Sequence, residues 1–236
     1  MLAEINKHIN DTRISFDEVD HNYFIDGEKA KFSVTEIIDK FFPEFDSAYW
    51  AKRKAIEKLN QDTIEYDSDI LKATIKKILD DWEKKRNDAA LKGTLLHERI
   101  EDFYNQKFHI EYPPEFEYFK NFHNKYEKLE AYRTEWRIYD DSLSIAGTVD
   151  MVYKKENNEL FIFDWKRTSK LVDQNNQLVL KDFNYGFDGL SHIADNSFNK
   201  YALQQNVYKF ILENYYDKTI SSMNLLILHP NYNNYV

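Results

Sequence analysis

The spacing of apolar residues changes several times along this chain of 236 residues. Two short alternating runs within residues 13–32 are typical of a β-hairpin, and the pair Asp26-Gly27 favours a tight turn. From residue 33 to residue 129 the apolar positions recur every three or four residues, which predicts helices. We expect these helices at residues 33–42, 49–59, 69–90, 95–105 and 115–129.

Local signals set the expected helix ends. Ser33 and Glu36 have the spacing of a capping box, and Pro43 cannot continue the helix that follows it. Asp46 is expected to cap the next helix. Gly93 interrupts the long charged pattern that precedes it, so we expect one helix to end there and a second to start with Thr94 as its cap.

Alternation returns in the second half of the chain, where we expect strands at residues 131–139, 146–153, 160–166 and 223–229. The run Leu160–Lys166 is apolar on both sides, which indicates a central, buried strand, and residues 156–159 are expected to form the turn before it. A long polar and aromatic segment, 167–197, precedes a last helix at 198–216.

These elements predict an α/β (α+β) fold with a central mixed sheet flanked by helices. We expect a single domain, residues 1–236, in which an N-terminal hairpin and helical lobe (1–92) precedes the core (93–236).

Composition excludes several kinds of site. There is no cysteine, which rules out disulfides, thiolate zinc sites and cysteine-ligated iron–sulfur clusters. No apolar run is long enough to span a membrane, and the N-terminus lacks the pattern of a signal peptide. The chain is therefore expected to be soluble and intracellular, with no membrane partner.

The net charge of −9 counts against a nucleic-acid partner, because such proteins usually carry a basic excess. Lysine and arginine are nevertheless clustered within residues 52–58 and 72–86. Each of these side chains taken singly is best explained as part of a solvated helix surface. The alternative interpretation is a local basic groove in an acidic protein.

Candidate chemistry lies at the end of the buried strand, where Asp164 and Lys166 point to the same side. If the preceding strand pairs with this one as a hairpin, Asp150 comes within reach of the same ion. Two adjacent carboxylates repel each other unless a cation lies between them, and oxygen ligands favour Mg²⁺ or Mn²⁺. The alternative for the Asp-x-Lys pair alone is a surface salt bridge.

The order Asp150…Asp164-Trp165-Lys166 resembles the core of the PD-(D/E)XK nucleases, with Val149 in place of the proline. Residues 82–101, which contain His97, resemble the first motif of the RecB-like and lambda-exonuclease-like branch. Gln204 and Tyr208 look like the Gln-x-x-x-Tyr motif of the same branch, and residues 21–46 are similar to the N-terminal segment of its phage- and virus-type members.

The resemblance implies a restriction-endonuclease-like core and a role for each matching residue. The implied metal ligands are His97, Asp150, Asp164 and the carbonyl of Trp165, and the implied catalytic residues are Asp150, Asp164 and Lys166. Glu135 is a candidate extra acid, although a cross-strand partner for an arginine is an equally good explanation. The expected contacts to substrate are Arg167, Thr168, Gln204 and Tyr208.

The expected function is metal-dependent hydrolysis of DNA, with an exonuclease acting on DNA ends favoured. The expected setting is recombination, repair or replication, in the host cytoplasm if a phage or virus encodes the chain. Alternatives are an endonuclease, a nucleic-acid-binding subunit with a degenerate site, and a metalloprotein without nuclease activity. DNA is the expected partner. A recombination or replication protein and a second copy of the chain, in a homo-oligomer, are further candidate partners.

Overall fold

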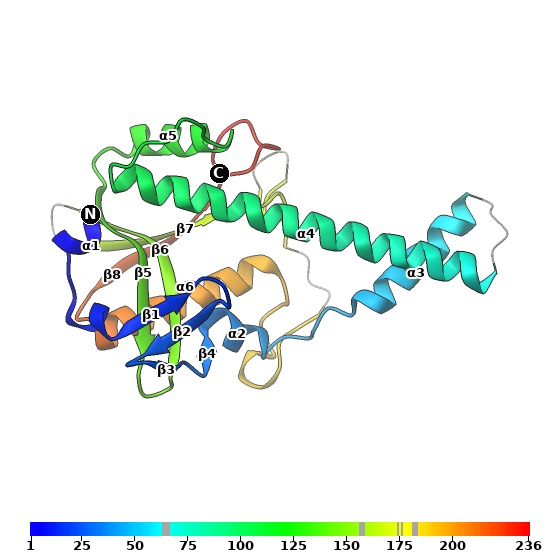
Figure 1. Ribbon diagram of the computed structural model, residues 1–236, viewed down its shortest axis with the longest axis horizontal. Coiled ribbons are helices and arrows are strands. Elements are labelled where there is room, and N and C mark those ends of the chain that lie inside the picture. Colours follow the sequence, from blue (N-terminus) through cyan, green and yellow to red (C-terminus); the bar gives the residue numbers. More distant parts are fainter. Residues whose placement is uncertain (63–66, 156–158, 174, 176, 181–183) are drawn as a thin grey trace. The chain divides into compact units, whose positions relative to one another are not determined.

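The computed structural model describes residues 1–62, 67–155, 159–173, 175, 177–180 and 184–236. Over these residues the fold is α+β, as predicted (Figure 1). The helices are α1 (Leu2–Ile5), α2 (Val34–Asp39), α3 (Ser47–Gln61), α4 (Ser68–Tyr104), α5 (Phe116–Lys125) and α6 (Ser197–Tyr215), with short 3₁₀ helices at Ile9–Thr12 and Asp188–Leu190. The strands are β1 (Ile14–Asp17), β2 (Asn22–Ile25), β3 (Glu28–Lys29), β4 (Phe32–Ser33), β5 (Glu130–Asp140), β6 (Ile145–Lys154), β7 (Leu160–Lys166) and β8 (Ile220–Ile227).

Strand β6 organises the larger, mixed sheet. It pairs antiparallel with β5 along most of its length, antiparallel with β7 near its C-terminal end, and parallel with β4 at its start. Strand β8 lies parallel to β7. A separate antiparallel sheet has the order β1-β2-β3, and its second turn has positive φ at both Asp26 and Gly27. Positive φ at both central residues is the geometry that an Asp-Gly hairpin turn favours, so this expectation is confirmed.

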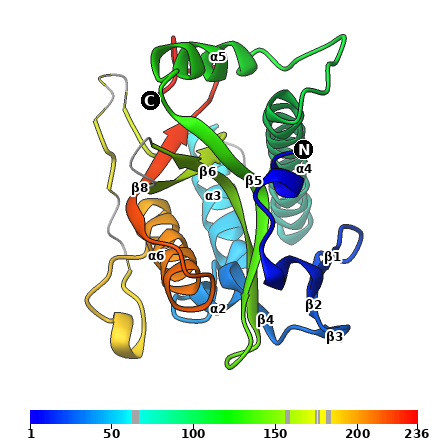
Figure 2. The same cartoon turned by 90° about the vertical axis from the view of Figure 1, so that its left-hand side faces the viewer.

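The central strand β7 is buried on both faces, as the sequence predicted. Leu160 and Ile162 belong to a core that also contains residues of α2 and α6. Phe161, Phe163 and Trp165 face a second core, made with α5 and the C-terminal end of α4. Figures 1 and 2 show these helices covering opposite sides of the sheet. The alternation of β7 therefore assigns its last carboxylate and ammonium, Asp164 and Lys166, to the α6 side.

The expected cap of α2 is confirmed. Ser33 Oγ accepts from the Glu36 backbone N–H at 3.1 Å, and Glu36 Oε2 accepts from the Ser33 N–H at 2.6 Å. Asp46 Oδ1 likewise accepts from the Tyr49 N–H at 2.8 Å and begins α3. Of the expected turn at residues 156–159, only Glu159 lies within the described residues.

The expected break at Gly93 is wrong, because α4 runs without interruption from Ser68 to Tyr104 and Thr94 caps nothing. One glycine inside a helix costs only about 1 kcal/mol. The residues around it are strong helix formers, and Leu96 and Ile100 are completely buried one turn later. Packing of this last part of α4 against the sheet outweighs the local preference of glycine to end a helix.

Replacing Gly93 by alanine is therefore expected to stabilise the protein. A Cβ added at this position has no neighbouring atom within 4 Å, so alanine removes backbone entropy from the unfolded chain without a clash. We expect the free energy of unfolding to rise by about 0.5–1 kcal/mol, measured by urea denaturation followed by circular dichroism. A decrease of similar size would show that the helix does not pass through this residue.

The chain divides into two compact units. The larger unit comprises residues 1–43 and 95–236, and the smaller comprises residues 44–94. This division differs from the expected one at residue 92, because the N-terminal hairpin and α2 belong with the mixed sheet. Helix α2 packs on α6, and β4 adds to the same sheet as β6. Within the described part of the chain, no helix combines the length and apolarity that a membrane crossing requires.

Candidate metal centre

The candidate site begins where strands β6 and β7 separate. Their backbone pairing ends at Met151 and Phe163, so Asp150 and Asp164 are the next residues on the two strands. The Trp165 N–H donates to Asp150 Oδ2 at 2.9 Å instead of to a strand partner. The carboxylate of Asp150 is thereby fixed at the end of the hairpin.

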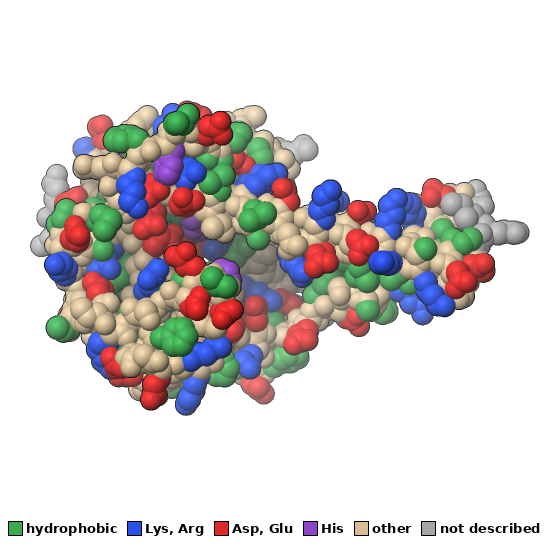
Figure 3. All heavy atoms as spheres, in the orientation of Figure 1, with side chains coloured by type: hydrophobic (Ala, Val, Ile, Leu, Met, Phe, Trp, Pro, Cys, Tyr) green, Lys and Arg blue, Asp and Glu red, His purple; other side chains and the backbone are tan. Residues whose placement is uncertain are grey.

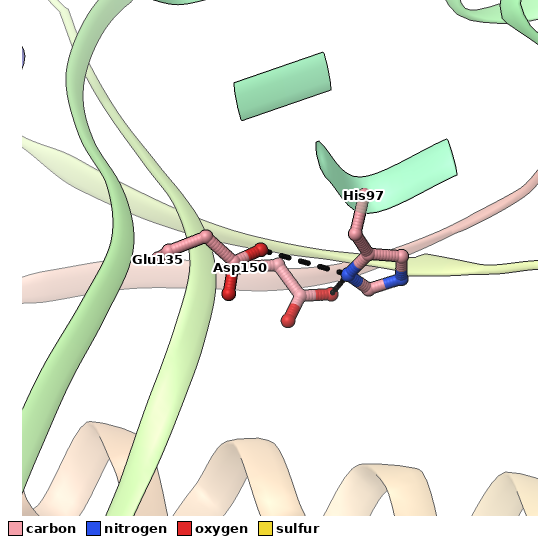
Figure 4. A group of neighbouring side chains, drawn as sticks. All are labelled: His97, Glu135 and Asp150. Carbon is pink, nitrogen blue, oxygen red and sulfur yellow. Dashed lines mark ion pairs between the residues drawn. The ribbon is translucent and has the colours of Figure 1, made fainter. Parts of the chain in front are cut away.

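His97 reaches this point from α4. Its Nδ1 lies 3.6 Å from Asp150 Oδ2 and 3.6 Å from Glu135 Oε1, and Figure 4 shows the three side chains converging from α4, β6 and β5. Its other nitrogen, Nε2, donates to the Trp165 carbonyl at 3.0 Å. His97 thus lies beside two carboxylates and donates to a carbonyl oxygen. His97, Asp150 and Trp165 are members of the expected ligand set.

Glu135 occupies a strained position in β5. Its neighbours Thr134 and Trp136 pair with Met151 and Val149 of β6, which places Glu135 opposite Asp150. The φ angle of Glu135 is +44°, in the left-handed region that costs a non-glycine residue of the order of 1–3 kcal/mol. Strain of this kind is concentrated at functional sites. The carboxylate of Glu135 meets His97, which favours the role of an extra acid at the site.

Lys166 is held between a carboxylate and an aromatic ring. Its Nζ lies 2.9 Å from Asp164 Oδ2 and 4.6 Å from the centre of the Tyr201 ring on α6. Only 19% of the Lys166 side chain and 4% of the Asp164 side chain are exposed. Tyr201 is a site residue that the sequence did not indicate.

Burial and mutual repulsion set the protonation of these groups. Burial raises the pKa of Asp150, and the charge of Glu135 adds to this effect against the opposing effects of His97 and Lys166. Burial and then Asp150 raise the pKa of Asp164. Burial alone would lower the pKa of His97, but Asp150 and Glu135 outweigh it and raise that pKa to about 9. Lys166 and a proton on His97 thus offset part of the negative charge of the three acids.

This arrangement suits a metal ion. One ligand atom from each of His97, Glu135 and Asp150 lies within 4.8 Å of the others, so these residues could hold a cation together. Among the described residues, the buried Asp164 Oδ2 has the Lys166 ammonium as its partner, at 2.9 Å. The Lys166 ammonium supplies the positive charge that this buried carboxylate requires. The donor set consists of carboxylates, an imidazole and a carbonyl, and contains no thiolate.

Two of the expected substrate contacts, Gln204 and Tyr208, have partners within the chain. Tyr208 is buried in the core beside Gly147. Its hydroxyl accepts from Gln204 Nε2 at 3.0 Å, and the same amide donates to Thr35 Oγ1 at 3.1 Å. A phosphate could receive a hydrogen bond from Gln204 only if one of these bonds were broken.

Arg167 and Thr168 also have partners within the chain. The Arg167 guanidinium pairs with the buried carboxylate of Glu115, 2.6 Å from its Nε, and only 12% of the arginine side chain is exposed. Thr168 Oγ1 accepts from the Lys170 N–H at 3.2 Å. Arg167 therefore links the end of β7 to the start of α5, and its expected contact with a phosphate would cost this buried ion pair.

Gly147 is a structural requirement that the sequence did not reveal. A Cβ at this position would lie 2.6 Å from Tyr208 Cε1 and 3.1 Å from Val34 Cγ2. We expect Gly147→Ala to lower the free energy of unfolding by about 1–3 kcal/mol, measured by urea denaturation. The double variant Gly147→Ala/Tyr208→Leu should recover part of the loss. An unchanged stability in Gly147→Ala would contradict this packing.

No protein-family model matches the chain, and a search of curated proteins found no match.

Proposed function

We propose that this protein is a divalent-metal-dependent nuclease that hydrolyses DNA phosphodiester bonds. The observation that carries the proposal is the convergence of His97 from α4, Asp150 from β6 and the Asp164–Lys166 pair of β7. These residues come from distant parts of the sequence and match, in order, the PD-(D/E)XK resemblance. A surface salt bridge would not explain why Asp164 and Lys166 are almost completely buried.

The proposed ion is Mg²⁺ or Mn²⁺, because the donors are mainly carboxylate and carbonyl oxygens. His97, Glu135 and Asp150, whose ligand atoms lie within 4.8 Å of one another, would hold it. The resemblance adds Asp164 and the Trp165 carbonyl as further ligands. When bound, the metal lowers the pKa of water and offsets charge that develops on the phosphate. His97 Nδ1 faces Glu135 and Asp150 at 3.6 Å each, and it would lose its proton when the ion binds.

Lys166 acts in this proposal as a charged donor. Burial would lower the pKa of Lys166, but Asp164 and Asp150 outweigh it and hold that pKa above its ordinary value. An ammonium that stays protonated is a poor base. It can orient the attacking water by a hydrogen bond and stabilise negative charge in the transition state.

Tyr201 positions Lys166, so the two substitutions Tyr201→Leu and Tyr201→Phe should differ. Loss of the ring in Tyr201→Leu removes a cation–π contact worth about 0.5–2 kcal/mol, and we expect kcat to fall by roughly 2- to 30-fold. Tyr201→Phe keeps the ring and should stay near the wild-type rate. The measurement is single-turnover cleavage of labelled DNA. Equal cleavage rates for the two variants would show that the Tyr201 ring does not position Lys166.

We favour an exonuclease acting on DNA ends, as the RecB-like resemblance implies, serving recombination, repair or replication. An endonuclease with the same centre is the second candidate. Both need the same metal-holding residues, so the form of the DNA substrate must divide them.

The test uses end-labelled linear duplex and single strands, and covalently closed circular DNA, each incubated with Mg²⁺, Mn²⁺ or a chelator. The proposal predicts cleavage of linear DNA with metal and none with chelator. If the covalently closed circular DNA is not cleaved, the enzyme is an exonuclease. If it is cleaved, the enzyme is an endonuclease. If no DNA is cleaved in any metal, while Mn²⁺ still binds, the chain is a metalloprotein without nuclease activity.

A further inference from the structure

Helix α3 concentrates positive charge in a chain that is acidic overall. Between Ser47 and Gln61 it carries four basic residues against the single acid Glu57, a net charge of +3, whereas the whole chain has −9. The basic residues are all exposed: Lys52, Arg53, Lys54 and Lys58. A polyanion approaching the smaller unit therefore meets a locally positive helix, despite the net charge of the protein.

The start of α3 also exposes two large aromatic rings. Tyr49 is 55% exposed and Trp50 is 44% exposed, and their ring centres are 5.4 Å apart. The guanidinium of Arg53 lies 5.3 Å from the centre of the Trp50 ring. Arg53 also pairs with Glu57, but an exposed ion pair is weak and does not occupy its charge fully.

A second cation lies on an aromatic ring within the same unit. Lys54 Nζ is 5.8 Å from the centre of the Trp82 ring on α4, and the exposed ring of Phe45 is 6.0 Å from the same ring. The opposite side of α3 is formed by small, buried residues, Ala51 and Ala55. In the space-filling view, hydrophobic, basic and acidic side chains are interspersed over this unit (Figure 3).

We propose that the face of α3 formed by Tyr49, Trp50, Arg53 and Lys54, called here the α3 face, binds a single strand of DNA. Cations beside exposed rings match a chain of phosphates with unpaired bases, because the cations contact the phosphates and each ring can stack on a base. A duplex offers the phosphates but keeps its bases stacked on one another. The inference rests on the proposed function and adds to it a place where the strand is held outside the metal centre.

The test is fluorescence-anisotropy binding of labelled single-stranded oligothymidine to the full chain in EDTA, where no cleavage can occur. Two double variants remove the rings (Tyr49→Ala/Trp50→Ala) or the charges (Arg53→Ala/Lys54→Ala). The matched control removes two exposed lysines of α4 in the same unit (Lys76→Ala/Lys77→Ala). All substituted side chains are exposed, and circular dichroism checks that each variant keeps its helices.

We expect both α3 variants to weaken binding at least ~10-fold and the control by less than about twofold. Removing Arg53 and Lys54 should also lower the slope of log K against log salt by about 1.4, since each phosphate contact on a single strand contributes about 0.7. Trp50→Phe should retain most of the affinity, because it keeps a ring.

Equal losses in the α3 variants and the control would overturn the inference, since binding would then depend only on total charge. So would unchanged binding in the ring variant, or binding of anionic phosphatidylserine vesicles, but not DNA, through the same residues. Failure of the proposed function looks different. A chain that binds single strands through the α3 face but cleaves no DNA keeps this inference and loses the nuclease. If the wild-type chain cleaves DNA but the α3 variants bind single strands normally, the proposed function is kept and this inference is lost.

Discussion

Lys166→Ala is expected to reduce the rate of DNA cleavage by at least ~100-fold while the protein still folds and binds metal. The ammonium is 2.9 Å from Asp164 Oδ2 and rests on the Tyr201 ring, so its place is fixed before substrate arrives. Its loss removes positive charge from the transition state but removes none of the proposed metal ligands. Single-turnover cleavage measures the rate, and Mn²⁺ binding measures the metal site separately.

Lys170→Ala is the matched control, because this lysine is exposed and lies only four residues further along the chain. It should cleave like the wild type. A Lys166→Ala protein that turns over within a few-fold of the wild type would show that the ammonium has no part in the chemistry.

Asp150→Asn should lose cleavage by at least ~100-fold and also lose metal binding. The amide oxygen of asparagine can still accept the Trp165 N–H that Asp150 accepts now, at 2.9 Å, so the hairpin end is expected to stay in place. What the substitution removes is a buried negative charge close to Glu135 and Asp164. Because burial and Glu135 raise the pKa of Asp150, its ionised form is unfavourable in the folded protein without metal.

The same variant should therefore be at least as stable as the wild type when metal is absent, and less stable than the wild type when metal is present. Urea denaturation with EDTA and with Mn²⁺ gives both comparisons. Asp20→Asn, an exposed residue of the β1–β2 turn, is the control and should change neither. A large loss of stability in EDTA would mean that Asp150 is a structural residue.

Sequence reasoning worked best where a local pattern and the tertiary contacts favour the same structure. The alternating apolar residues of β7 face two different cores, and the Ser33–Glu36 cap forms as expected. The pairing of Asp150 with the end of β7 also followed from a simple hairpin. In each case neighbours close in sequence determine the outcome.

It failed where distant packing decides. Gly93 does not end α4, because the buried Leu96 and Ile100 hold the helix against the sheet. Tyr208 has a motif-like spacing from Gln204, but its ring fills the space that Gly147 leaves. Spacing can bring two side chains to one helical face, yet it cannot tell whether that face meets solvent or a strand.

Two features of the site had no readable signal. The left-handed backbone of Glu135 depends on its place opposite Asp150 within the sheet, and no residue type at that position indicates it. The contact between Lys166 and Tyr201 depends on how α6 lies against β7. Both could be recognised only once the strands and helices were assembled.

The most direct measurement is titration of the full chain with Mn²⁺ followed by electron paramagnetic resonance, in the absence of DNA. The signal of free Mn²⁺ should fall as the ion binds, and the double variant His97→Ala/Asp150→Asn should leave it unchanged. Wild-type protein that leaves the signal unchanged, or a double variant that binds as tightly as the wild type, would contradict a metal centre at these residues.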